Sequence, residues 1–156
     1  MDFEIQIKNI KEKEFRYSAH NLNSINDKHL SLGFKLGFKV NPKKNCFTIK
    51  LVVIYNYDNP SEEGEQLELL YFSIATKFKI KNLKKIIRKE ENDDNKFEMP
   101  DAIMITMVGA AISTIRGMMV YKLSGTLLSE YYLPLINIPD FLDIKSSQNV
   151  NEDSAN

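Results

Sequence analysis

Strict alternation of apolar and polar residues in the first half of the chain sets the strongest constraint on its fold. In the segment 30–40 every even position is apolar, and every odd position is serine, glycine or lysine. A period of two places one face of a β-strand on a core and leaves the other in water. Two more long strands are expected at 47–57 and 67–80, and a shorter one at 3–10. The pattern predicts an antiparallel meander, with the segment 17–29 as a crossover loop.

The second half of the chain is dominated by one apolar helix. After a charged loop expected at 89–98, Pro100 and Asp101 favour a helix start and Gly125 favours a helix end. The helix is therefore expected at about 101–124. This segment is apolar almost all round, whereas an ordinary surface helix is apolar on one side only.

Three explanations compete for a helix of this kind. A membrane span is disfavoured because Arg116 would stand inside it, at a cost of about 2.5–3.5 kcal/mol. In a monomeric core helix, the glycines would admit a bulky side chain from the sheet. In the third explanation one face packs on the sheet and the other on a second copy of the chain, because three small residues stand four positions apart in one line. The candidate interface residues are Gly109, Ser113, Gly117, Met118 and Tyr121.

Composition indicates one soluble cytoplasmic domain. The chain has 156 residues, and we expect the domain to span 1–144 and the polar residues 145–156 to form a disordered tail. A single cysteine, Cys46, excludes an internal disulfide and suits a reducing compartment, and the N-terminus lacks the pattern of a signal peptide. The 21 basic residues balance 21 acidic ones, and the basic stretch 77–89 is interrupted by apolar residues. Neither nucleic-acid binding nor stable membrane insertion is expected.

The sequence contains no pattern of catalytic or metal-binding residues. His20, His29 and Cys46 do not have the spacing of a zinc site. The six glycines fit neither a P-loop nor a dinucleotide-binding motif. The acidic residues in 62–65 and 90–94 lack the spacing of a calcium loop. We therefore expect no enzymatic activity, no cofactor and no metal.

Aromatic and aliphatic residues are concentrated in two segments that lack a periodic core signature. One is the crossover loop with its flanks, and the other is 127–142, which should be mostly extended with one turn at 140–142. Such residues either extend the core or wall an apolar groove that binds extended peptides. The candidate peptide-binding residues are Phe15, Tyr17, Leu22, Ile25, Tyr131, Tyr132, Leu133, Leu135 and Phe141.

The order of these elements resembles that of the SecB family of export chaperones, over about residues 3–142. The opening strand 3–7 is similar to the family's first strand, and the segment 78–80 (FKI) resembles the family's Phe-Ser-Ile at the end of the third long strand. The segment 112–119 (ISTIRGMM) resembles the family's arginine-bearing helix. The Gly-Thr pair at 125–126 and the stretch 133–137 (LPLIN) resemble the break and the Pro-containing stretch that follow that helix.

The resemblance implies an α+β fold, in which a four-stranded antiparallel sheet packs on a long C-terminal helix. It also implies a dimer of dimers with the helices at its centre, and grooves that bind unfolded polypeptides without ATP. This chain departs from the family in charge, because SecB export chaperones are acidic and this chain is neutral. The family's acidic contacts for the translocation motor ATPase would fall near Tyr71 and Arg16, which leaves only Glu12 as a comparable acid. Some SecB-like proteins instead protect an antitoxin of a toxin–antitoxin pair, a role that does not need those contacts.

The function predicted from the sequence is an ATP-independent holdase for unfolded or extended polypeptides, in protein export or in antitoxin protection. The alternative is a non-enzymatic adaptor whose apolar helix docks on one dedicated folded partner.

Overall fold

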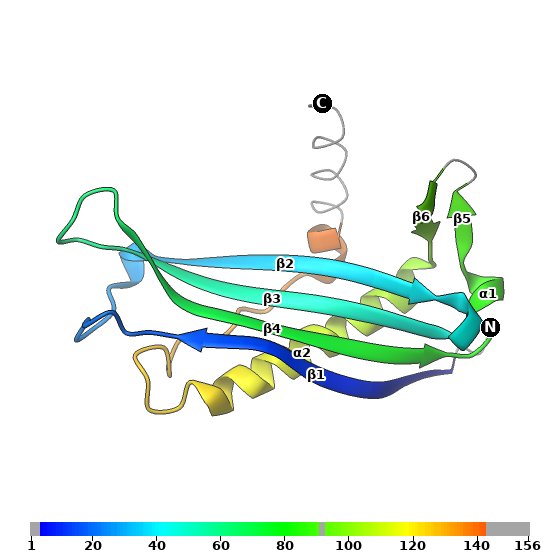
Figure 1. Cartoon of the computed structure of the whole chain (residues 1–156), viewed down its shortest axis with the longest axis horizontal. Coiled ribbons are helices and arrows are strands. Elements are labelled where there is room, and N and C mark those ends of the chain that lie inside the picture. Colours follow the sequence, from blue (N-terminus) through cyan, green and yellow to red (C-terminus); the bar gives the residue numbers. More distant parts are fainter. Residues whose placement is uncertain (1–3, 91–92, 143–156) are drawn as a thin grey trace.

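The computed structural model describes residues 4–90 and 93–142. Its main sheet contains β1 (Ile5–Tyr17), β2 (Leu30–Asn41), β3 (Cys46–Asp58) and β4 (Gln66–Ile80). The spatial order is β1-β4-β3-β2, and every neighbouring pair is antiparallel. The long helix α2 (Asp101–Lys122) lies across one face of this sheet (Figure 1). The expected α+β architecture and the meander of three long strands are confirmed.

The first strand is longer than its sequence pattern indicates. It was expected to end near residue 10, but β1 continues to Tyr17 and pairs with β4 throughout. Two register shifts interrupt the pairing, one between Ile7 and Asn9 and the other between Glu12 and Glu14. Each β-bulge adds a residue and reverses the phase of the alternation, so the period of two is lost in the sequence although the strand persists. Phe15 and Tyr17 therefore belong to the sheet and not to the crossover loop.

The segment expected as a charged loop at 89–98 is also more regular than predicted. A one-turn helix, α1 (Leu83–Ile86), precedes a small hairpin formed by β5 (Arg88–Glu90) and β6 (Asp93–Glu98). Phe97 anchors the hairpin, since its ring meets that of Phe47 edge to face at a centroid distance of 5.6 Å. Two short strands with this many charges give no apolar period, which explains why the pattern was missed.

Two single-turn 3-10 helices lie at the starts of β2 and β3. One is η1 (Asp27–His29), capped by the side chain of Asn26, and the other is η2 (Pro42–Lys44), capped by that of Asn41. Asparagine caps of this kind satisfy backbone N–H groups that no strand partner can reach. The crossover between β1 and β2 is otherwise irregular, as expected.

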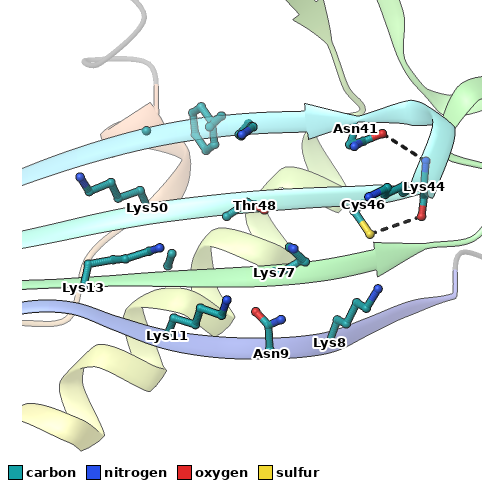
Figure 2. A pocket seen from close by; sticks show the side chains of 14 residues that line it. Lys8, Asn9, Lys11, Lys13, Asn41, Lys44, Cys46, Thr48, Lys50 and Lys77 are labelled. Carbon is teal, nitrogen blue, oxygen red and sulfur yellow. Dashed lines mark hydrogen bonds between the residues drawn. The ribbon is translucent and has the colours of Figure 1, made fainter.

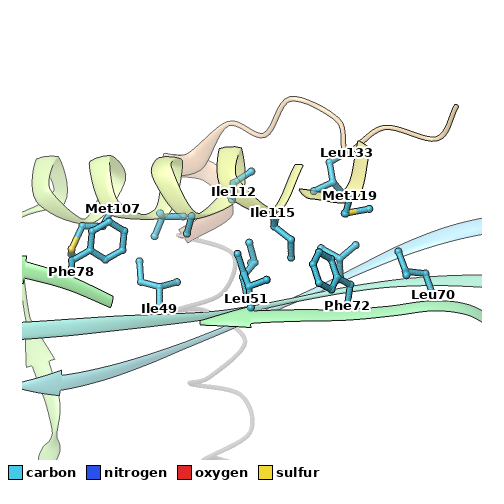
Figure 3. Close-up of a cluster of buried hydrophobic side chains, with 14 of the residues drawn as sticks. Ile49, Leu51, Leu70, Phe72, Phe78, Met107, Ile112, Ile115, Met119 and Leu133 are labelled. Atoms are coloured by element: carbon cyan, nitrogen blue, oxygen red, sulfur yellow. The ribbon is translucent and has the colours of Figure 1, made fainter. Parts of the chain in front are cut away.

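The core lies between the sheet and α2. Figure 3 shows Ile49, Leu51, Phe72 and Phe78 of the sheet directed toward Met107, Ile115 and Met119 of the helix. All these sheet residues and the first two helix residues are at most 1% exposed. Burial of apolar surface on this scale is the main stabilising contribution in such a fold. The inner face of α2 consists of Ile103, Met107, Val108, Ala111, Ile112, Ile115 and Met119.

The helix runs unbroken through both of its interior glycines and ends close to the expected position. Gly125 follows it with φ of +76°, a left-handed conformation that glycine adopts without steric cost. Residues 123–130 form turns, 131–137 have no regular secondary structure, and 138–142 form one helical turn. By length and composition α2 could cross a membrane, but in this fold its inner face is packed on the sheet. The expected tail 145–156 lies outside the described residues.

Candidate functional site

Arg116 fastens the C-terminal segment across α2. Its Nε donates to the carbonyl of Leu133 at 3.2 Å, and its Nη2 donates to the carbonyl of Pro134 at 2.9 Å. These carbonyls belong to extended chain with no strand partner, so a charged donor satisfies them well. The segment then approaches the helix closely at Ile138, because a Cβ placed on Gly109 would lie only 3.1 Å from the Cδ1 of Ile138.

Tyrosine hydroxyls join the same segment to the sheet and to the crossover loop. The hydroxyl of Tyr131 donates to Oδ1 of Asp27 at 2.5 Å, a contact between residues 104 positions apart. Tyr55 donates to the backbone carbonyl of Tyr131 at 3.2 Å, and the hydroxyl of Tyr17 accepts from the backbone N–H of Leu127 at 3.1 Å. Each tyrosine combines an apolar ring on the core with a polar tip at its edge, so the three bonds fix the segment without burying an unpaired polar group.

Two of these tyrosines have perturbed acidities. The hydrogen bond to Asp27 raises the pKa of Tyr131 to about 12, because loss of the phenolic proton would place two negative charges in contact. Burial raises the pKa of Tyr55 above its ordinary value, since a tyrosinate would be poorly solvated there. Both groups are therefore neutral hydrogen-bond donors at neutral pH.

Four large apolar side chains remain exposed on α2 and the C-terminal segment. On the helix, Val120 is 48% exposed and Tyr121 is 85% exposed. On the segment, Tyr132 is 62% exposed and Leu135 is 92% exposed. Val120 and Tyr132 line the same shallow hollow beside Arg116, so the helix and the segment contribute to adjoining surface. We call these four residues the apolar surface.

The structure sorts the candidate peptide-binding residues into three groups. Tyr132 and Leu135 are exposed, whereas Leu133 is buried at 4% exposure and belongs to the core. Five other candidates are half-buried and packed against the core: Phe15, Tyr17, Leu22, Ile25 and Tyr131. Phe141 is also half-buried, and its ring meets that of Phe34 edge to face. The crossover loop and the C-terminal segment are joined by the bond between Tyr131 and Asp27. The groove expected between these two segments stays a prediction, and among the candidates the exposed apolar area lies on Tyr132 and Leu135.

The candidate interface residues on α2 are also divided. Ser113, Gly117 and Tyr121 are exposed, and Met118 is half-buried. A Cβ placed on Gly117 would have no atom within 4 Å apart from those of its sequence neighbours and its own helix backbone, so that position is open. Gly109 instead makes room for Ile138 of the same chain. Val120 was not selected from the sequence, although its spacing of three from Gly117 places it on the same face.

The described residues contain no cluster of three or more histidine, cysteine or acidic side chains that could hold a metal ion. His20 uses its Nε2 in a hydrogen bond of 2.7 Å with the carbonyl of Glu68, and the ring of His29 packs on that of Tyr57. Both histidines have a structural contact that accounts for their position.

No family model matches the chain, and no curated protein matches it. Among solved structures, a similar one is the Rv1957 SecB-like chaperone of Mycobacterium tuberculosis, in complex with a ChAD peptide from the Rv1956 HigA1 antitoxin. The TM-score is 0.56 at 18% sequence identity, and the match covers 85% of this chain and 91% of that chain. The chain has a SecB-like fold. The resemblance found in the sequence is thereby confirmed at the level of the fold.

A second match is a protein of unknown function from Streptococcus agalactiae, at 10% identity, covering 87% of this chain and 99% of that chain. Its TM-score is 0.32. Within the SecB-like fold, the helix arginine, Arg116, has a definite structural role in this chain, because it holds the segment that presents Tyr132 and Leu135.

Proposed function

We propose that this protein is an ATP-independent holdase that binds extended apolar segments of unfolded polypeptides. The observation that supports this proposal most directly is the apolar surface, which a SecB-like fold leaves uncovered on α2 and the C-terminal segment. The Rv1957 chaperone, which shares the fold, was solved with a peptide from an antitoxin. A polypeptide client is therefore the ligand that the fold comparison favours.

Apolar burial explains how such a surface would bind many sequences. Full burial of one large apolar side chain is worth about 1.5–3 kcal/mol, and it requires no particular orientation. Association also costs translational freedom and chain order, so one contact gives no useful affinity and several are needed together. Tyr132 and Leu135 would supply contacts at one end of the site, and Leu22 and Ile25 of the crossover loop would extend them.

The outer face of α2 would be covered by a second copy of the chain. Ser113 and Gly117 leave room for a close backbone approach, and Val120 and Tyr121 supply apolar area beside them. One two-fold contact of this kind gives a dimer, and the dimer of dimers that the resemblance implies would need a second contact between two such dimers. Several client sites per assembly would raise the avidity for one long unfolded chain. The division is then simple, with Tyr121 facing the second copy and Tyr132 and Leu135 facing the client.

Docking on a translocation motor is not included in this proposal. At the two positions where the resemblance would require acids, the guanidinium of Arg16 lies over the ring of Tyr71, 4.2 Å from its centroid. The nearby Glu14 and Glu68 are both ion-paired with Arg16. Glu12 is paired with Lys122 at 2.8 Å.

We place the protein in the cytoplasm, where its buried, unpaired Cys46 would stay reduced.

The test is suppression of aggregation of a chemically denatured reporter protein, without nucleotide. We expect suppression near stoichiometric ratio, and a clear loss in the double variant Tyr132→Ala with Leu135→Ala. Glu130→Ala is the matched control, because Glu130 is exposed on the same segment but carries no apolar surface. Full suppression by the double variant would rule out the proposed surface. No suppression by the wild type would rule out the proposed activity.

The alternative is a non-enzymatic adaptor whose apolar helix docks on one dedicated folded partner, and the exposure of Val120 and Tyr121 on α2 supports it. The two alternatives differ in selectivity. A general holdase should bind several unrelated unfolded proteins with similar affinity, whereas a dedicated chaperone or adaptor should bind one partner far more tightly. Competition of unlabelled unfolded proteins against one labelled client measures this difference.

A further inference from the structure

The sheet face opposite α2 carries a basic hollow that the proposed holdase activity does not use. Its volume is about 640 Å³, and its lining includes no acidic residue. The lining side chains come from all four strands, as Figure 2 shows for Lys11 on β1, Lys77 on β4 and Lys50 on β3. We call this hollow the lysine trough. Its seven lysines are Lys8, Lys11, Lys13, Lys39, Lys44, Lys50 and Lys77.

Strand register explains why the lysines gather here. Gly37, Lys50 and Ala75 are successive partners across β2, β3 and β4, so they lie side by side on one face. Glycine and alanine leave the floor low between the long lysine side chains, and Thr48 adds another small side chain. An extended chain could therefore lie on the floor with lysine ammonium groups on both sides of it.

The lysines of the trough lack ion-pair partners within the described part of the chain. The ion pairs found there involve Arg16, Lys81 and Lys122 instead. Seven like charges around one concave surface repel one another and raise the local concentration of anions. An anionic ligand would relieve this repulsion, which makes the trough a binding surface for negative charge.

The opposite end of the sheet has the reverse charge. The connection between β3 and β4, at the far end from the β2–β3 turn in Figure 1, carries exposed acids at Asp58, Glu62, Glu63 and Glu65. The whole chain has a formal net charge of zero. A long uniform polyanion such as duplex nucleic acid or a membrane surface would be attracted at one end and repelled at the other. A short acidic ligand fits the basic end alone.

The side chains of the trough also favour protein over nucleic acid. Its lining contains no arginine, the residue best suited to phosphate through its planar fork. Phe38 is the one aromatic residue of its lining, and it lies on the inner-face register of β2 and packs on Phe47 at a centroid distance of 5.7 Å, so the trough has no row of rings for successive bases to stack on. Flexible lysine side chains are sufficient to bind the carboxylates of an acidic peptide.

We propose that the lysine trough binds a short, extended, acidic segment of a partner protein. Along β1, the span from Lys8 to Lys13 is about 17 Å at roughly 3.3 Å per residue, so a ligand of about eight residues covers it. Alternate side chains of such a ligand point the same way, and a repeat of acidic and small residues places every carboxylate over the lysines. This surface lies across the sheet from the apolar surface, so an acidic segment and an apolar client can bind together.

The test uses the full chain and a fluorescein-labelled peptide of about eight residues that alternates glutamate and serine. Fluorescence anisotropy should show binding at low salt that weakens steeply as salt rises, because exposed charge pairs are screened. The triple variant Lys11→Gln, Lys50→Gln, Lys77→Gln should bind at least about tenfold more weakly. The control triple variant Lys28→Gln, Lys84→Gln, Lys85→Gln removes equal charge at exposed sites outside the trough and should bind within about twofold of wild type. Circular dichroism verifies that both variants are folded.

Two further probes decide the class of ligand. They are a polyuridine oligonucleotide of matched length and vesicles of phosphatidylserine with phosphatidylcholine. Tighter binding of either probe than of the peptide would overturn the proposal. Equal losses in the two triple variants, equal binding of a glutamine–serine peptide, or no binding of the acidic peptide at low salt would overturn it too. Aggregation suppression by the trough variant should be unchanged, which separates this proposal from the holdase activity.

Discussion

The two sides of α2 differ in how far the rest of the chain covers them. The inner side is fully covered by the sheet, with Ile115 and Met107 at 0% exposure. The outer side carries Ser113 and Gly117 and ends with Val120 and Tyr121, which remain 48% and 85% exposed. Both sides are apolar enough to blur the amphipathic pattern of an ordinary surface helix. An apolar residue on the inner side is therefore explained by this chain alone, and the exposed Val120 and Tyr121 are the residues that the proposed contact with a second copy would cover.

The largest expected effect tests that division directly. Ile115→Ala should lower the free energy of unfolding by about 2–5 kcal/mol, because it leaves a cavity between the helix and the sheet. Tyr121→Ala should change the stability of a single subunit by no more than about 0.5 kcal/mol, since its side chain is exposed. The same variant should shift sedimentation toward smaller species. A large loss of subunit stability in Tyr121→Ala, with the assembly state unchanged, would contradict the division between the two sides.

Arg116 lies between the two sides and tests how the C-terminal segment is held. Arg116→Ala removes two charge-assisted hydrogen bonds to the carbonyls of Leu133 and Pro134, and we expect a loss of about 1–3 kcal/mol. The loss should be local, with faster amide hydrogen exchange and easier proteolysis in 131–142 than in the sheet. Arg116→Lys should recover only part of it, because lysine lacks the planar fork that reaches both carbonyls. Uniform acceleration across the whole chain would instead indicate a global role for Arg116.

The parts of the fold that could be predicted from the sequence are those with a long continuous signal. The segments of β2, β3 and β4 each alternate over ten residues or more, and α2 is one long apolar run that begins after Pro100 and ends before Gly125. The predicted end of β1 at residue 10 came too early, because two bulges change the phase of the alternation within the thirteen residues of this strand. The hairpin of β5 and β6 was missed because its short strands are mostly charged.

The site was less predictable because its defining contacts are distant in sequence. Tyr132 and Leu135 were selected as apolar residues in an irregular segment, but the same reasoning selected Leu133, which is buried. Only tertiary structure separates these neighbours. The bond between Tyr131 and Asp27 joins the crossover loop to the C-terminal segment, and nothing in either local sequence indicates it. The lysine trough is collected from four strands, so the sequence shows no single basic run at this place.

A smaller effect is expected from the open position on the outer side of α2. Gly117→Ala should stabilise a subunit by up to about 1 kcal/mol, because alanine favours the helix and a Cβ there meets no atom within 4 Å. The same methyl group should weaken association if a second copy approaches closely at this point. Gly109→Ala is the matched control, where Ile138 must shift by a few tenths of an ångström and the gain should be smaller. Unchanged association in Gly117→Ala would remove this position from the proposed interface.

The smallest effect concerns the bond that joins the crossover loop to the C-terminal segment. The pKa of Tyr131 is raised from its ordinary value of 10 to about 12, so the folded state holds this proton more tightly than the unfolded state does. The contribution of the bond to stability is therefore complete below pH 10 and is lost as the pH rises through about 12. Tyr131→Phe should lower stability slightly at neutral pH and flatten the alkaline decline between these values.

The difference between the tyrosinate absorbance titrations of wild type and Tyr131→Phe isolates this one phenol among seven tyrosines. We expect the absorbance change that the wild type shows and Tyr131→Phe lacks to be centred near pH 12. Asp27→Asn provides the decisive comparison, because it keeps a hydrogen-bond acceptor but removes the negative charge that opposes ionisation of Tyr131. In that variant the pKa of Tyr131 should return toward 10. A Tyr131 that titrates near 10 in the wild type would mean that the loop and the segment are not joined in solution, and the groove between them would then be open to a client.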